Sequence, residues 1–112
     1  MRNSVLALAT VVALAAAGAT SAAEAGGDAA AGRVIAARYC AACHEIPGLD
    51  GRAAPAPLTP PAFAAIAAHP ETYTRARLER FLRAPHFPMK TLVLSRHDIA
   101  NLIAFIESLR AL

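Results

Sequence analysis

Two cysteines three positions apart, with a histidine directly behind the second, limit the folds open to this chain more than any other feature. In 112 residues, Cys40 and Cys43 are the only thiols, and His44 follows them. A disulfide between them would close a loop too small to restrict the unfolded chain much. A redox-active C-x-x-C pair needs a thiolate of low pKa, usually within a βαβ pattern, and the sequence shows no such strands. A structural zinc site needs four ligands, and there is no second cysteine pair.

The remaining interpretation uses all three residues, because C-x-x-C-H is the covalent attachment signature of haem c. About one helical turn separates the two sulfurs, so both can reach the vinyl groups on one edge of a porphyrin. The imidazole of His44 can then turn under the iron as its first axial ligand. We therefore predict one haem c per chain, bound covalently through Cys40 and Cys43.

Residues 1–25 have the organisation of a secretory signal peptide. A positive segment at 1–3 precedes an uncharged apolar run at 4–18, and the small residues that follow allow cleavage after Ala23 or Ala25. An uncleaved membrane anchor is the alternative, but the run is shorter than the ~18 to 20 residues that span a bilayer. We predict a cleaved leader at 1–25, one domain at 26–112, a periplasmic location and no membrane anchor after cleavage.

Cleavage would leave a small, mildly basic domain. Removal of Arg2 and Glu24 leaves ten basic and seven acidic side chains, so the formal net charge stays at +3, which is not a nucleic-acid-binding signature. With no Trp, four Phe, two Tyr and eight Pro, the domain has little apolar bulk. Chains of this size commonly need a disulfide, a metal or a cofactor to fold. We expect a cofactor to fill part of the core.

Hydrophobic spacing predicts helices and no convincing strand. The first helix runs over 29–39 from an N-cap at Asp28, and the last begins at Ser95, with Asp98 completing a shortened capping box. Between them we expect a short helix at 62–68 and another at 75–84, capped by Thr74. The apolar faces are formed by Gly32, Ile35, Ala36 and Tyr39 in the first helix, by Leu78, Phe81 and Leu82 in the third, and by Ile99, Leu102, Ile103, Ile106 and Leu109 in the last, with Phe105 at its margin.

Residues 47–61 are too rich in Pro and Gly for regular structure. A loop of that length without secondary structure is usually functional or disordered. Wrapping around the cofactor would give this loop a function.

Four arginines, at positions 75, 77, 80 and 83, occupy the remaining circumference of the third helix. A solvated face is the simpler interpretation. The alternative is a docking surface for an acidic partner, in which case the association rate falls with added salt.

Met89 is the predicted second axial ligand, on the haem face opposite His44. It is the only methionine of the predicted mature chain, and it lies 45 residues beyond His44 in a proline-bounded loop before the last helix. The alternative is that Met89 only fills space in the core. His86, His97 and His69 are competing ligands, each of which we expect to be a surface histidine.

With these residues the chain resembles the class I cytochromes c of the small bacterial monohaem type. The resemblance runs from Gly32 through the C-x-x-C-H segment and Met89 to Phe105 in the last helix. It implies an all-α cytochrome c fold, with four to five short helices around one covalently bound haem. In that family a glycine of the first helix meets an aromatic residue of the last, roles that Gly32 and Phe105 match. A proline carbonyl accepts a hydrogen bond from the proximal histidine, and Pro61 is the best match.

The resemblance implies a periplasmic one-electron carrier between redox proteins, with no enzyme activity of its own. Its expected partners are redox-protein donors and acceptors, acidic-surfaced ones if the arginines steer docking, and neither nucleic acid nor a membrane. Two other functions stay open. One is the cytochrome subunit of a periplasmic dehydrogenase or oxidase complex, and the other is a gas-binding haem protein in which Met89 is not a ligand. The sequence leaves the oligomeric state open.

Overall fold

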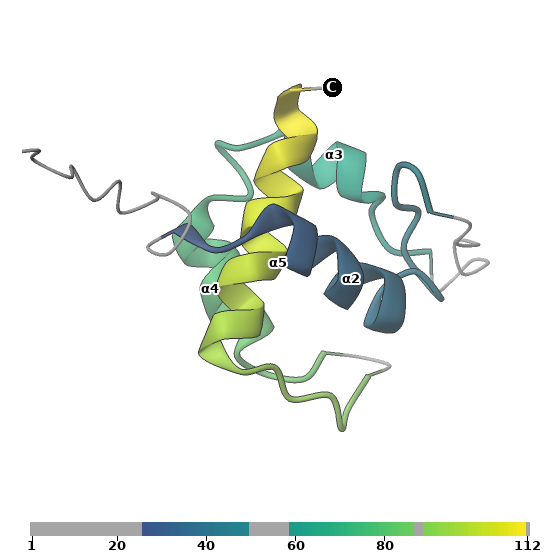
Figure 1. Cartoon of the computed structure of the whole chain (residues 1–112), viewed down its shortest axis with the longest axis vertical. Coiled ribbons are helices and arrows are strands. Elements are labelled where there is room, and N and C mark those ends of the chain that lie inside the picture. Colours follow the sequence, from purple (N-terminus) through teal and green to yellow (C-terminus); the bar gives the residue numbers. More distant parts are fainter. Residues whose placement is uncertain (1–25, 50–58, 87–88, 112) are drawn as a thin grey trace, which may run out of the picture.

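The computed structural model describes residues 26–49, 59–86 and 89–111, and within them the fold is all-α (Figure 1). The helices are α2 (Ala29–Tyr39), α3 (Phe63–Ala68), α4 (Arg75–Leu82) and α5 (Arg96–Ser108), followed by the short 3-10 helix η1 (Leu109–Ala111). These residues contain no strand, which confirms the predicted fold class. Nor do they include a helix with the length and apolar character needed to cross a bilayer. The predicted leader at 1–25 and the middle of the Pro-rich loop lie outside the described residues.

The three predicted N-caps are present. The side chain of Asp28 accepts hydrogen bonds from the first turn of α2, and Thr74 accepts one from the Arg77 N–H of α4. Ser95 and Asp98 form a reciprocal capping box at the start of α5. Each cap satisfies backbone donors that have no partner within the helix, so the helix starts follow from local chemistry. The helix ends differ slightly from prediction, since α3 starts one residue later and α4 stops at Leu82.

Helices α2 and α5 pack against each other and form the centre of the molecule (Figure 1). They approach so closely at Gly32 that a Cβ atom there would lie 1.9 Å from the Asn101 carbonyl oxygen and 2.8 Å from Cβ of Phe105. The predicted meeting of Gly32 with Phe105 is confirmed. Around this crossing, Leu102 and Ile103 of α5 are buried together with Ala36 of α2.

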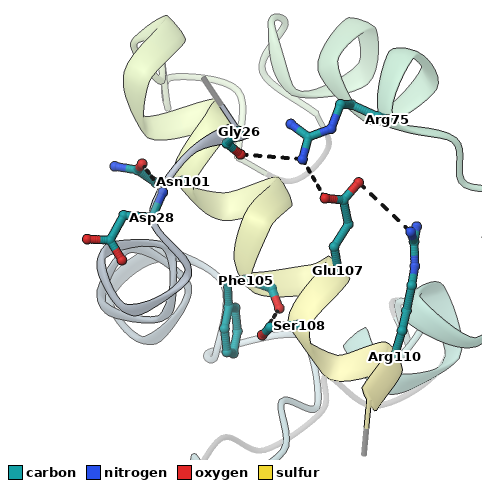
Figure 2. A network of polar contacts seen from close by, with 8 residues as sticks. All are labelled: Gly26, Asp28, Arg75, Asn101, Phe105, Glu107, Ser108 and Arg110. Atoms are coloured by element: carbon teal, nitrogen blue, oxygen red, sulfur yellow. Dashed lines mark hydrogen bonds and ion pairs between the residues drawn. The ribbon is translucent and has the colours of Figure 1, made fainter. Parts of the chain in front are cut away.

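The segment before α2 is tied to α5 by a buried amide. Asn101, which is 3% exposed, accepts a hydrogen bond through Oδ1 from the Asp28 N–H at 2.8 Å (Figure 2). Gly27 has a φ of +86°, and a Cβ there would lie 2.2 Å from the Ala100 carbonyl oxygen. The chain therefore enters α2 along a path that this glycine permits.

Arg75 links three parts of the fold and does not belong to a solvated face. Its guanidinium pairs with the Glu107 carboxylate of α5 and also donates to the Gly26 carbonyl oxygen at 3.4 Å (Figure 2). Glu107 also lies 3.9 Å from Arg110. Both members of the Arg75 and Glu107 pair are partly buried. The interpretation of the α4 arginines as a solvated face is wrong for Arg75, because its guanidinium is partly buried and paired with a carboxylate. The sequence pattern of α4 could not indicate this, since Glu107 belongs to a distant part of the chain.

Two residues assigned to apolar faces are more exposed than predicted. Tyr39 is 37% exposed at the end of α2, where the Arg38 guanidinium lies 5.3 Å from its ring centre. Phe81 is 54% exposed, while its helical neighbours Leu78 and Leu82 contribute to the core or pack against it. Helical spacing alone placed both rings in the core, but Phe81 instead lines a cavity.

Candidate functional site

The Cys40 to His44 turn continues directly from the last residue of α2. The N–H groups of Cys43 and His44 both donate to the Cys40 carbonyl oxygen, at 3.1 and 2.8 Å. This tight turn holds the two thiols and the imidazole close together. Both cysteines are free thiols, Cys40 buried and Cys43 partly buried.

The electrostatics of Cys40 disagree with a redox-active pair. Burial, and to a smaller extent the neighbouring Cys43, raise the pKa of the Cys40 thiol to about 11. Reactive thiols of C-x-x-C redox proteins have their pKa values lowered, because the thiolate is the nucleophile. The environment of Cys40 acts in the opposite direction.

His44 is oriented by a neighbouring loop. Its Nδ1 lies 2.8 Å from the Pro61 carbonyl oxygen, which can only accept, so Nδ1 carries the proton and donates. In the neutral ring Nε2 is then bare, with the lone pair that metal ligation requires. The ring also meets Phe63 edge-on, with centres 5.1 Å apart. The contact predicted for Pro61 is confirmed.

The Pro61 loop is itself fixed against the turn. The Phe63 N–H donates, at 2.9 Å, to the carbonyl oxygen of Glu45, the residue that follows His44. Phe63 is buried and lies 6.3 Å from the ring of Phe105 in α5. The imidazole of His44 is thus positioned by the same packing that holds α3 to the core.

A cavity of about 640 Å³ opens beside the turn. This volume is in the range of cofactor sites. Its walls come from the turn, the Pro61 loop, α3, α4 and the segment after α4: Cys43, His44, Thr59, Pro60, Pro61, Ile66, Tyr73, Arg77, Leu78, Arg80, Phe81, His86 and Met89. Apolar side chains predominate, and the cationic side chains are two arginines of α4.

Of the predicted site residues, Cys43, His44 and Met89 line this cavity, whereas Cys40 does not and is buried in the core beside it. The donors present fit a haem. The turn carries two free thiols, one imidazole presents an unprotonated nitrogen, and the cavity is mainly apolar. In the described part of the chain, no three His, Cys, Asp or Glu side chains gather in a way that could hold a metal ion by themselves.

His86 is the histidine that sequence reasoning misplaced. It is half-buried and lines the cavity, with its ring stacked 4.9 Å from Phe81 and 6.5 Å from His44, measured between ring centres. Burial lowers the pKa of His86, and the nearby His44 lowers it further. The expectation of a surface position is wrong for His86. It holds for His69 and His97, which are exposed and do not line the cavity.

Arg77, Arg80 and Tyr73 also line the cavity, whereas the sequence predicted a solvated or docking face for the two arginines and no site role for Tyr73. Arg77 lies 5.9 Å from the Tyr73 ring centre and donates to the Thr72 carbonyl oxygen at 3.0 Å. The arginine spacing along α4 was visible in the sequence, but which flank of the helix faces a cavity depends on tertiary packing.

A family described as cytochrome c matches residues 29–110. A curated protein named cytochrome c-552, from Bradyrhizobium diazoefficiens, is 37% identical over 79 residues, which cover 70% of this chain and 72% of that protein. No solved structure matches the chain.

Proposed function

We propose that this chain, which belongs to the cytochrome c family, is an exported carrier that passes single electrons between redox proteins. Family membership makes it an electron-carrier haem protein of the all-α cytochrome c fold, with covalently bound haem c as its cofactor. Electron transfer of this kind makes and breaks no substrate bond. The observation that carries the finer proposal is that His44, whose Nδ1 donates to the Pro61 carbonyl oxygen, lines one mainly apolar cavity together with Cys43 and Met89.

We assign each site residue a role. Cys40 and Cys43 would form the thioether links to haem, and His44 would bind its iron through Nε2. Met89 would supply the second protein ligand through its sulfur. Bound haem supplies an iron that alternates between the ferric and ferrous states, and ligation by His and Met together raises its reduction potential compared with two histidines.

The surrounding residues keep this site rigid and dry. The hydrogen bond from His44 to Pro61 fixes the imidazole plane and makes the ring a better donor to a metal. Ile66 and Leu78 present apolar surface to the cavity, so little water remains there to reorganise. Arg77 and Arg80 supply positive charge for the anionic propionates of a haem.

The proposed function predicts a haem-loaded product with two stable redox states. Expressed with an intact haem-ligation pathway, the full chain should yield a protein whose mass exceeds that of the leaderless peptide by one haem. Its oxidised spectrum should include the weak far-red band of a methionine sulfur on ferric iron. The reduced form should bind carbon monoxide poorly. A mass equal to the bare peptide would contradict the proposal, and rapid carbon monoxide binding would favour a gas-binding protein instead.

The same mass measurement tests the leader. We propose that residues 1–25 direct export and are removed, so that the protein works in the periplasm. Bacterial c-type cytochromes are typically exported, which supports this location. The expected mature N-terminus follows Ala23 or Ala25. A retained N-terminal segment in the purified holoprotein would contradict cleavage.

We also propose that its redox partners carry acidic surfaces. Arg77, Arg80 and Arg83 are exposed along α4, beside the cavity that Arg77 and Arg80 line. Opposite charges steer encounters, and salt screens that attraction over about 8 Å at physiological ionic strength. Stopped-flow electron transfer with an acidic redox protein should therefore slow as salt is added. With a basic redox protein the rate should rise, and an equal response to salt for both would contradict the steering role.

A further inference from the structure

The imidazoles of His86 and His44 line the same cavity, and the distance between their ring centres is suited to one metal ion between them. An imidazole nitrogen binds a transition metal at roughly 2 Å, and the ring centre lies about 1 Å behind that nitrogen, so two rings on opposite sides of one metal have centres about 6 Å apart. The centres of His44 and His86 are 6.5 Å apart, with the ring planes at 74°. Rings on opposite sides of a metal can be rotated freely about the axis that joins them, so this angle is compatible with joint ligation.

The position of His86 is supported by its neighbours. Its ring lies 4.9 Å from that of Phe81, tilted by 34°, and both rings line the cavity. His86 is half-buried, unlike His69 and His97, which are exposed. A surface histidine without a role would not be expected to pack on an aromatic ring that lines the cofactor cavity.

His86 and Met89 both contribute side chains to the cavity wall. The Met89 N–H donates to the His86 carbonyl oxygen at 2.6 Å, so the two residues lie close together. A thioether and an imidazole thus share the same space, where only one of them can bind a given coordination position. The soft thioether favours ferrous iron, whereas an imidazole in the same place lowers the reduction potential.

We propose that His86 is a reserve distal ligand, whose imidazole takes the coordination position opposite His44 whenever the Met89 sulfur leaves it. This inference rests on the proposed function, because it requires haem bound at the Cys40 to His44 turn. It adds a second ligand state, with two histidines and a lower reduction potential, to the His and Met state of the carrier. Loss of the sulfur would then lower the potential without opening the iron to small molecules.

The test compares variants of the haem-loaded chain in which one donor or both are removed. Met89→Ala removes the sulfur. His86→Phe keeps a ring to pack on Phe81 but has no nitrogen, so it separates ligation from packing. His97→Phe is the matched control, since that histidine is exposed and outside the cavity wall. The readouts are the spin state of the oxidised protein, the reduction potential and the rate of carbon monoxide binding.

With Met89→Ala alone, and with His97→Phe added, we expect a low-spin protein of lowered potential that binds carbon monoxide slowly. Adding His86→Phe to Met89→Ala should give a high-spin oxidised protein that binds carbon monoxide at least tenfold faster. A Met89→Ala protein that is already high-spin would overturn the proposal. So would a double variant that stays low-spin, since another group would then be the reserve ligand.

Two further results separate this inference from the proposed function. If the far-red methionine band is missing and His86→Phe alone makes the protein high-spin, His86 is the resident ligand and not a reserve, which overturns the inference. If no haem mass is found, the proposed function fails and the inference falls with it. Haem retained in every variant with the spin states described above supports both.

Discussion

The double substitution Cys40→Ala and Cys43→Ala yields a chain that carries no covalent haem and holds no stable tertiary structure. Both proposed attachment points are removed, so a haem that does enter can dissociate. The cavity of about 640 Å³ is then left to water and to the side chains around it. A cavity of this size is far larger than the space left by a single truncated side chain.

The rest of the core is too small to compensate. Among the described residues, half of the buried apolar side chains belong to α2 and α5, α3 adds Phe63, Ile66 and Ala67, and the others, such as Ile46 and Leu78, are single contributions. Ile66 and Leu78 would lose their cofactor-facing contacts on one side, and Phe81 is already 54% exposed although it packs against His86. A domain below about 70 to 80 residues rarely gains more than about 3 to 5 kcal/mol from its core alone, and the predicted mature domain is only slightly longer. Loss of the cofactor is expected to remove most of this stability.

Far-UV circular dichroism, limited proteolysis and intact mass together measure the effect. The control is the unmutated chain made without the haem-ligation machinery, which should resemble the double variant because it lacks the same cofactor. Truncation of the buried Cys40 side chain to alanine by itself lowers the free energy of unfolding by only about 1 kcal/mol. A loss of stability of that size would therefore indicate a packing effect and not the loss of haem. A haem-free double variant that unfolds cooperatively and resists protease would contradict the prediction.

The sequence predicted best what depends on neighbouring residues. Asp28, Thr74 and Ser95 cap helices through side chains that reach backbone donors two or three residues away, so their effect is visible in a short window. The Cys40 to His44 turn likewise has its three functional groups within five residues. The contact of Gly32 with Phe105 and that of His44 with Pro61 joined distant segments, and they were accessible only through the family resemblance.

The errors at Phe81, His86 and Arg75 share one physical cause, since each involves a partner that is distant in sequence or the cofactor itself. Hydrophobic spacing cannot distinguish a face that packs on protein from one that packs on haem, so Phe81 was assigned to the core. His86 follows a proline in a loop, where no periodicity indicates which way the side chain points. Arg75 pairs with Glu107, 32 residues further along the chain, and the residue spacing within α4 does not indicate this pairing.

Gly32→Ala lowers the stability of the holoprotein by about 2 kcal/mol or more, the second large effect we expect. Two terms of opposite sign compete. Alanine is the better helix former by ~1 kcal/mol, which favours the substitution in α2. Against this, the new Cβ would lie 1.9 Å from the Asn101 carbonyl oxygen, a contact with backbone that no rotamer change can relieve. Helices α2 and α5 would have to separate, and overpacking of this kind typically costs 1 to 3 kcal/mol and occasionally more.

We expect the destabilising clash to exceed the gain in helix propensity, because it acts at the crossing around which the core is built. Separation of α2 and α5 loosens the contacts of Ala36 and Leu102, both at most 1% exposed, so the cost extends beyond one atom pair. Thermal unfolding should show a midpoint lowered by about 10 °C or more, since each 1 kcal/mol shifts a domain of this size by ~4 to 8 °C. Gly26→Ala is the matched control, because a Cβ there meets nothing within 4 Å, and its midpoint should barely move. Equal unfolding midpoints for the two variants would contradict the prediction, because they would mean that α2 and α5 can separate without loss of stability.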